Sequence, residues 1–257
     1  MGRLDNKVAI ITGGAGEIGQ AAGALFAKEG ARVLLADLNE EKLQEAVAAI
    51  GGNSVSYCVT DVTKAEDNQA MVACAEERYG GVDVFLANAG VEGLVKPIPD
   101  YTEADFDHVM NVNVKGVFLG LQATVPALKK RGAGSIVITS SVAGVEGYGH
   151  VLPYVTSKHA VVGMMRSAAK ECAADKIRVN TVNPSPVDGR MISSLNEGMS
   201  DMVGVNAADL TAASKAAIPL QRYARPDEIA QVMLFLASDD ASWVTGSVYM
   251  ADGGNTT

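Results

Sequence analysis

The sequence is poor in cysteine, in aromatic residues and in positive charge. Its 257 residues include three cysteines and three histidines, and Phe, Trp and Tyr make up only 5% of the chain. Cys58, Cys74 and Cys172 are odd in number and far apart, which excludes a disulfide framework, gives no zinc-ligand spacing and favours a reducing, cytoplasmic location. Lys and Arg number 21 against 30 Asp and Glu, a net charge of −9. Such an acidic chain is a poor partner for nucleic acid or for an anionic membrane surface.

The sequence also has no apolar run of the length that a membrane-spanning helix needs, about 20 residues. Its first apolar run, residues 8–11, is too short for the core of a signal peptide. No Pro- or Ser-rich linker, internal repeat or low-complexity segment divides the chain. Because 48% of the residues are hydrophobic and 20% are charged, we predict one large globular domain over residues 1–257.

Short β-branched runs alternate with longer helical patterns along the chain. Strands are expected at residues 8–12, 32–36, 54–59, 82–87, 135–139, 177–182 and 247–250. Helices are expected at residues 18–29, 40–50, 65–79, 103–130, 154–173 and 226–237. Apolar strands that alternate with helices predict a parallel sheet covered on both faces. The expected fold is therefore α/β, a single-domain doubly wound (Rossmann) sheet.

The strand–helix alternation lapses between Pro184 and Arg222. Met191, Met199 and Met202 stand there among Ser, Asn, Gly and acidic residues. A long segment of this kind inside a compact domain is often a lid or a binding loop, so residues 184–222 are expected to cover a substrate site. The alternative is a pair of surface helices that only packs against the domain.

A glycine-rich turn follows the first strand and reads Thr12-Gly13-Gly14-Ala15-Gly16-Glu17-Ile18-Gly19. Small residues allow the backbone to approach a pyrophosphate at the N-terminus of the next helix. The second strand ends at Asp37, eighteen residues after Gly19, and Leu38 follows it. A carboxylate there accepts hydrogen bonds from an adenosine ribose and repels a 2′-phosphate, which favours NAD over NADP. The alternative role for Asp37 is the N-cap of the helix that follows.

Two further strand ends carry polar or small residues. Asp61 and Val62 follow the third strand, and Asn88, Ala89 and Gly90 follow the fourth. Carboxyl ends of parallel strands meet at one edge of the sheet, where such folds bind ligands. We therefore expect these residues to line the same crevice as the glycine-rich turn, although each motif alone is also ordinary turn chemistry.

Four polar residues form a candidate catalytic set. Tyr154 and Lys158 are four residues apart at the start of a predicted helix and so share one face. Ser141 lies thirteen residues before Tyr154, and Asn113 lies in the long fourth helical pattern. Hydride transfer to or from a carbonyl carbon also needs a proton at the oxygen, and Tyr154 is the predicted acid or base because Lys158 favours its phenolate. Ser141 is expected to hold the substrate oxygen, and Asn113 to carry a water between Lys158 and solvent.

Together these motifs resemble the short-chain dehydrogenase/reductase family over residues 7–254. The similar features include Tyr154-Val155-Thr156-Ser157-Lys158, Pro184-Ser185-Pro186-Val187, Arg225-Pro226-Asp227-Glu228-Ile229-Ala230 and Asp252-Gly253-Gly254. The resemblance implies a seven-stranded Rossmann sheet and a tetrad of Asn113, Ser141, Tyr154 and Lys158. It also implies cofactor contacts from Tyr154, Lys158, Pro184 and Val187, and a homotetramer or homodimer.

Three positions depart from the family pattern. Glu17 stands where the turn usually has a second Gly, Ser185 where Gly is common after Pro184, and Gly189 where a Thr often contacts the nicotinamide amide. A carboxylate near a pyrophosphate is unfavourable unless it points to solvent or binds a cation. These departures bear on cofactor affinity and lid closure, whereas the tetrad is complete.

The leading hypothesis is an NAD(H)-dependent oxidoreductase that acts, without a metal, on a small secondary alcohol or ketone. One alternative uses NADPH, which Asp37 and the absence of Lys or Arg from residues 13–19 disfavour. The other is a non-catalytic dinucleotide-binding sensor or scaffold, which has no need of a complete tetrad. Substrate walls are expected from residues 91, 92 and 94, from residues 142–152 and from the lid. Polar walls would suit a hydroxylated substrate, and apolar walls a cyclic or aliphatic ketone.

Overall fold

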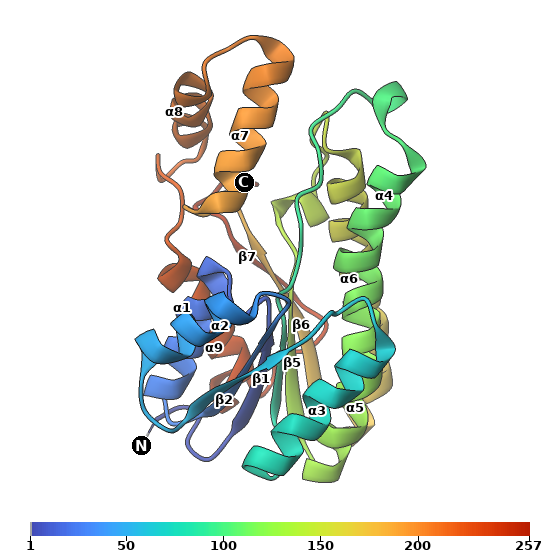
Figure 1. The fold of residues 1–257 in the computed structure, drawn as a ribbon, viewed down its shortest axis with the longest axis vertical. Helices are drawn as coiled ribbons and strands as arrows, with labels where there is room; N and C mark the ends of the chain where they lie inside the picture. The colour runs from blue at the N-terminus through green and yellow to red at the C-terminus, as the bar shows by residue number, and fades with distance from the viewer. Residues whose placement is uncertain (1) are drawn as a thin grey trace.

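A seven-stranded parallel sheet forms the centre of the computed structural model, which describes residues 2–257 (Figure 1). The strand order is β3-β2-β1-β4-β5-β6-β7. The strands are β1 (Val8–Thr12), β2 (Arg32–Asp37), β3 (Val55–Val59), β4 (Val84–Ala87), β5 (Gly134–Thr139), β6 (Ile177–Pro184) and β7 (Val248–Ala251). This confirms the predicted doubly wound fold, with strand ends that differ from the predicted ones by a residue or two.

Helices cover both faces of the sheet (Figure 1). One face carries α1 (Glu17–Lys28), α2 (Glu40–Ile50) and α9 (Pro226–Ala237), and the other carries α3 (Ala65–Tyr79), α5 (Gly116–Arg131) and α6 (Leu152–Cys172). Short 3-10 turns lie at Ile98–Asp100, Val142–Gly144, Ala173–Asp175 and Asp239–Ala241. Within residues 2–257, none of the helices has both the length and the apolar character to cross a bilayer.

The strands contribute side chains to two hydrophobic cores, one under each helical layer. In β1, Val8 and Ile10 pack with the α3, α5 and α6 side, whereas Ala9 and Ile11 pack with the α1 and α9 side. All four side chains are buried. Burial on both faces explains why the strands appear in the sequence as continuous apolar runs rather than as an alternation of apolar and polar residues.

The helix predicted over residues 103–130 is interrupted in its middle. It consists of α4 (Glu103–Met110), a π-helical turn (Asn111–Lys115) and α5. A capping box starts α4, because the Thr102 hydroxyl accepts a hydrogen bond from the Asp105 N–H at 3.1 Å and the Asp105 carboxylate accepts one from the Thr102 N–H at 3.0 Å. The π-helical turn holds Asn113, which is 2% exposed. Such turns inside α-helices are frequent at functional sites.

Two further helices stand beyond the carboxyl ends of the strands (Figure 1). They are α7 (Arg190–Val203) and α8 (Ala207–Ala217), and neither contains a fully buried residue. These two helices lie in residues 184–222, the segment for which the sequence predicted either a lid or a surface helix pair. Met191, Leu195 and Met199 of α7 line the cavity at the strand ends, so the segment is a helix pair that also covers this cavity. Its movement as a lid stays a prediction.

Candidate active site

A cavity of about 940 Å³ opens at the carboxyl ends of the central strands. It runs from Asp37 at the end of β2 to Ser141 after β5, and so crosses the point between β1 and β4 where the strand order reverses, the usual ligand site of such sheets. The predicted site residues on its wall are Gly13, Gly16, Glu17, Ile18, Asp37, Leu38, Asp61, Val62, Asn88, Ala89, Gly90, Ser141, Tyr154, Lys158, Pro184 and Val187. Two predicted residues, Gly19 and Asn113, lie behind the wall.

The glycine-rich turn after β1 is closely packed at Gly13 and Gly19 and open at Gly16. Gly13 has a φ of 66°, and a Cβ there would lie 2.9 Å from the Ala89 Cα. A Cβ on Gly19 would collide with the Gly13 carbonyl oxygen, so Gly19 serves the packing of α1 rather than the cavity. A Cβ on Gly16, in contrast, would meet nothing closer than 3.5 Å. The turn therefore leaves open backbone at the N-terminus of α1, where a diphosphate is favourable.

Asp37 is held against the same turn. Its carboxylate accepts hydrogen bonds from the Ala15 N–H at 3.1 Å and the Asn39 N–H at 3.3 Å. The N-cap of α2 is Asn39, whose side chain accepts a hydrogen bond from the Lys42 N–H at 3.0 Å. The N-cap alternative for Asp37 is therefore wrong. Since an ionised carboxylate can accept about four hydrogen bonds, Asp37 has capacity left for a ligand hydroxyl.

Asn88 ties together the ends of β1, β4 and β5 at the floor of the cavity. Its amide donates to the Thr12 carbonyl oxygen at 3.2 Å and accepts from the Thr139 hydroxyl at 3.1 Å.

Asp61, another predicted residue of the cavity wall, accepts a hydrogen bond from the Thr63 hydroxyl at 2.7 Å. This hydrogen bond lowers the pKa of the Asp61 carboxyl and keeps it ionised.

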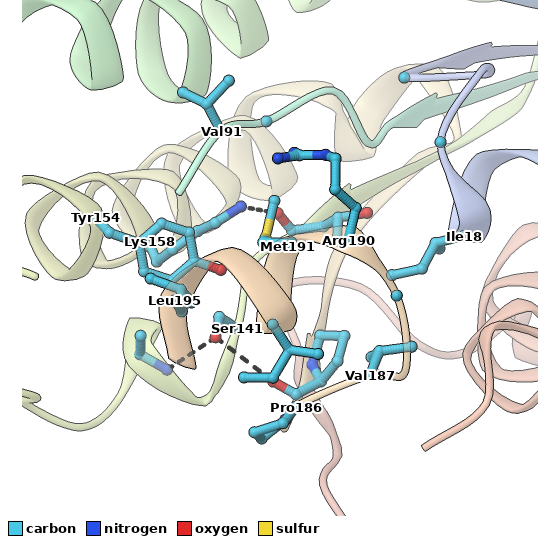
Figure 2. Close-up of a pocket in the computed structure, with 18 of the residues that line it drawn as sticks. Ile18, Val91, Ser141, Tyr154, Lys158, Pro186, Val187, Arg190, Met191 and Leu195 are labelled. Carbon is cyan, nitrogen blue, oxygen red and sulfur yellow. Dashed lines mark hydrogen bonds between the residues drawn. The ribbon is translucent and has the colours of Figure 1, made fainter. Parts of the chain in front are cut away.

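Ser141, Tyr154 and Lys158 come together at one end of the cavity (Figure 2). Figure 2 shows the Tyr154 hydroxyl pointing toward Ser141. The Lys158 Nζ lies 5.4 Å from the centroid of the Tyr154 ring and donates a hydrogen bond to the Thr139 carbonyl oxygen at 3.0 Å. The Ser141 Oγ accepts a hydrogen bond from the Ala143 N–H at 3.1 Å. These backbone partners fix Lys158 and Ser141 on either side of the phenol.

Burial dominates the ionisation of this group. It lowers the pKa of Lys158 to about 8. It also raises the pKa of Tyr154, a change that the hydrogen bond to Ser141 reduces and the negative charge of Glu92 reinforces. Desolvation of the phenolate is the largest of these effects, and the expectation that Lys158 favours the phenolate stays a prediction.

Asn113 has a structural task that the sequence did not reveal. Its side-chain amide donates to the Val91 carbonyl oxygen at 2.9 Å and to the Ser157 Oγ at 3.0 Å, and its Oδ1 accepts from the Val91 N–H at 2.8 Å. Both amide hydrogens are therefore engaged, so only an oxygen of Asn113 could hold the predicted water, and that role stays a prediction. Asn113 also joins the loop after β4 to α6, one residue before Lys158.

The wall around the catalytic group is mostly apolar. Its apolar residues are Val91, Val95, Val112, Val142, Val151, Met191, Ile192, Leu195, Met199 and Leu210. Polar groups on the wall come from His108, Tyr148, His150, Asn196, Ser214 and Asn255. Glu92 and Leu94, which the sequence placed on the wall, do not line the cavity, and Glu146 accepts a hydrogen bond from the Tyr148 hydroxyl at 2.9 Å. Among residues 2–257, no group of three or more His, Cys, Asp and Glu side chains is placed to hold a metal ion.

Two contributors to the site were missed from the sequence. Thr139 holds Lys158 through its backbone carbonyl, and a backbone contact leaves no sequence signal. Arg190 begins α7 and lies on the cavity wall. The helix itself had a signal, since Met191, Leu195 and Met199 recur at every fourth residue, which is a helical spacing.

Comparisons with known proteins agree with this geometry. Residues 13–256 match the family model described as Enoyl-(Acyl carrier protein) reductase. The chain is 35% identical to levodione reductase of Leifsonia aquatica, over 99% of this chain and 96% of that protein. It is 41% identical to a 3-oxoacyl-[acyl-carrier-protein] reductase of Thermotoga maritima, over 98% of each chain, and 35% identical to cyclohexanol dehydrogenase of an Acinetobacter species, over 99% and 96%. The crystal structure of levodione reductase matches with a TM-score of 0.92 at 35% identity, over 98% of each chain.

Proposed function

Because the chain belongs to the short-chain dehydrogenase/reductase family and is therefore an oxidoreductase, we propose that it transfers hydride between NAD(H) and a small secondary alcohol or ketone. The observation that carries this proposal is the single cavity that joins Asp37 and the glycine-rich turn to Ser141, Tyr154 and Lys158. A nucleotide site and an acid–base group that share one cavity are what hydride transfer with a nicotinamide cofactor requires.

The chain's own residues bind the reactants and move the proton. When bound, the nicotinamide supplies or accepts the hydride. Tyr154 donates its hydroxyl proton to the carbonyl oxygen in reduction, and takes the alcohol proton in oxidation. Ser141 donates a hydrogen bond to the same oxygen, and Lys158 stabilises the phenolate by its charge. The open turn at Gly16 would hold the diphosphate.

The walls of the cavity favour a cyclic or aliphatic ketone over a hydroxylated substrate. Apolar side chains dominate around Tyr154, from Val91 on the loop after β4 to Leu195 on α7. A pocket of this kind gains affinity by burying apolar ligand surface, and a few polar groups fix the orientation. The names of two relatives, levodione reductase and cyclohexanol dehydrogenase, agree with this substrate class.

The two alternatives fit the site less well. Use of NADPH would place a 2′-phosphate beside the Asp37 carboxylate, where like charges repel. A sensor or scaffold would not need a lysine buried beside a tyrosine, and Lys158 is 6% exposed. Burying the charged amine of a lysine costs free energy, and a protein that performs no chemistry would gain nothing in return.

Removing the charge of Asp37 is expected to change the choice of nucleotide. In the wild-type protein, a fluorescence titration should give a Kd for NADH about tenfold or more below that for NADPH. Repulsion between unit charges about 4 Å apart costs about 1 kcal/mol in water and about 4 kcal/mol near a protein surface, and a tenfold ratio of Kd corresponds to about 1.4 kcal/mol. Asp37→Ser is expected to reduce this ratio about tenfold. Glu41→Gln, at an exposed carboxylate of α2 away from the cavity, is the matched control and should leave the ratio unchanged. A ratio that Asp37→Ser leaves unaltered contradicts the assignment.

We further propose that the chain forms a homotetramer or homodimer in the cytoplasm. Large apolar side chains are exposed on α5 and beside or within β7, namely Phe118 (50% exposed), Trp243 (99%) and Tyr249 (38%). Contiguous exposed apolar surface marks association sites, and we propose that these side chains contribute to such a surface. The three cysteines are free, as in proteins of reducing compartments. Light scattering tests the assembly, and the mass of a single chain would contradict it.

A further inference from the structure

Arg190, the first residue of α7, binds the loops that follow two other strands. Its backbone N–H donates a hydrogen bond to the Glu17 Oε1 at 2.9 Å, in the turn after β1. Its guanidinium donates two hydrogen bonds to the Glu92 carboxylate, at 2.7 and 3.2 Å, in the loop after β4. Figure 2 shows Arg190 extending over Met191 toward Val91. A single residue of α7 thus connects both halves of the cavity.

Glu17 and Gly189, two of the departures from the family pattern, are parts of one arrangement. A Cβ added to Gly189 would lie 3.1 Å from the Cδ and Oε1 of Glu17, closer than ordinary van der Waals contact. The Glu17 carboxylate therefore occupies the space that a side chain at position 189 would need. It also lies at the N-terminus of α7, where the helix dipole favours a negative charge. This environment offsets the cost of a carboxylate in a diphosphate-binding turn.

Glu92 is the buried member of the group. Its side chain is 8% exposed, whereas that of Arg190 is 61% exposed. Burial acts to raise the pKa of Glu92, but the hydrogen bonds and the charge of Arg190 bring it below its ordinary value. A buried carboxylate without a cationic partner is strongly unfavourable. Glu92 therefore favours the position of α7 in which Arg190 reaches it.

We propose that Arg190 is a positioning residue that fastens α7 across the cavity through Glu17 and Glu92 and that neutralises the charge of Glu92, whose neighbour Val91 shares the cavity wall with Tyr154. The proposal rests on the acid–base role of Tyr154. When α7 moves away, Glu92 loses its cation, and its negative charge disfavours the Tyr154 phenolate. When α7 closes, the pair is neutral and the phenolate is favoured again. Closure over the substrate and preparation of the acid–base group are thus coupled through one ion pair.

The test of this proposal substitutes only Arg190 and Glu92 and leaves the other charged residues of the cavity unsubstituted. The remaining ionisable side chains on the cavity wall are Glu17, Asp37, Lys42, Asp61, His108, Tyr148, His150, Lys158 and Asp188. The Lys158 Nζ lies 5.4 Å from the centroid of the Tyr154 ring. Because none of these residues is substituted, a difference in the ionisation of Tyr154 among the variants reports the Arg190–Glu92 pair.

The test compares Arg190→Gln, Glu92→Gln and the double variant in the pH profile of kcat/KM for alcohol oxidation. The apparent pKa should fall by about half a unit or more in Glu92→Gln, rise by a similar amount in Arg190→Gln, and return close to the wild-type value in the double variant. Lys129→Met, which removes the charge of a remote surface pair with Asp175, is the control and should give no shift. Shifts of the same sign in the two single variants, or no shift in either, would overturn the proposal.

Hydrogen exchange in the ligand-free protein tests the fastening of α7 without any turnover. Exchange of the α7 amides should become about threefold to tenfold faster in Arg190→Gln, Glu92→Gln and Glu17→Ala, and stay unchanged in Lys129→Met. Unchanged exchange in all three variants overturns the fastening. If no alcohol is oxidised, the proposed function fails, and the ionisation of Tyr154 is then measured from phenolate absorbance as the difference between each variant and its Tyr154→Phe counterpart.

Discussion

Replacing Tyr154 by Phe is expected to reduce turnover about 10²- to 10⁴-fold, the usual contribution of a positioned general acid or base. The phenol is the group of the site that is aimed at Ser141 and paired with a buried lysine (Figure 2). Without its hydroxyl, the carbonyl oxygen receives no proton from Tyr154, and Lys158 has no phenolate to stabilise. The loss should therefore appear in kcat rather than in substrate binding.

The fold is expected to tolerate this substitution. Phe keeps the ring, and the Tyr154 hydroxyl donates no hydrogen bond to the backbone in the structure. The melting temperature and the Kd for NADH should therefore stay close to the wild-type values, which separates loss of chemistry from loss of structure. Turnover by Tyr154→Phe equal to that of the wild-type protein would remove the catalytic assignment and favour a sensor or scaffold.

Replacing Lys158 by Met is expected to abolish turnover while the protein stays as stable as before or becomes more stable. Burial lowers the pKa of Lys158 from 10.5 to about 8. Keeping the ammonium charged in the folded state at pH 7 therefore costs roughly 3 kcal/mol, at about 1.4 kcal/mol per pKa unit. Met fills a similar volume without that cost, although it gives up the hydrogen bond to Thr139. The Lys158 charge that activity requires therefore lowers the free energy of unfolding.

The sign of this effect with pH follows from the direction of the shift. The folded-state pKa of Lys158 lies below its unfolded value, so the cost is fully present below pH 8 and disappears as the pH rises toward 10.5. Between these values Lys158 makes the wild-type free energy of unfolding increase with pH. Denaturant unfolding at pH 7 and pH 10 should show this increase to be absent from Lys158→Met. A loss of several kcal/mol in Lys158→Met at pH 7 would show that the lysine stabilises the fold instead.

The sequence was sufficient for the sheet and for most of the cavity wall. Strands buried on both faces appear as apolar runs, and the rule of right-handed crossovers leaves few topologies for them. The residues at the strand ends, such as Asp37 and Asn88, follow because parallel strands present their carboxyl ends at one edge. The cap of α2 shows the limit of this reasoning, because Asp37 and Asn39 both suit an N-cap and only the geometry separates them.

What the sequence did not predict depends on exact register or on contacts between distant segments. The π-helical turn at Asn113 adds one residue to a helical turn without breaking the apolar pattern around it, so the helix seemed continuous. The pKa of Tyr154 depends on how deeply the phenol is buried, which spacing does not report. Glu17, Glu92 and Arg190 are remote from one another in the chain, and only the fold brings them together.

The most direct test of the central claim is to follow the oxidation of NADH by the purified protein in the presence of simple cyclic and aliphatic ketones, and then to repeat it with NADPH. We expect NADH to be consumed with a kcat/KM about tenfold or more above that for NADPH, because Asp37 lies where a 2′-phosphate would be placed. A clear preference for NADPH would contradict the role of Asp37. Failure to bind or oxidise either nucleotide would contradict the assignment of the cavity as a dehydrogenase site.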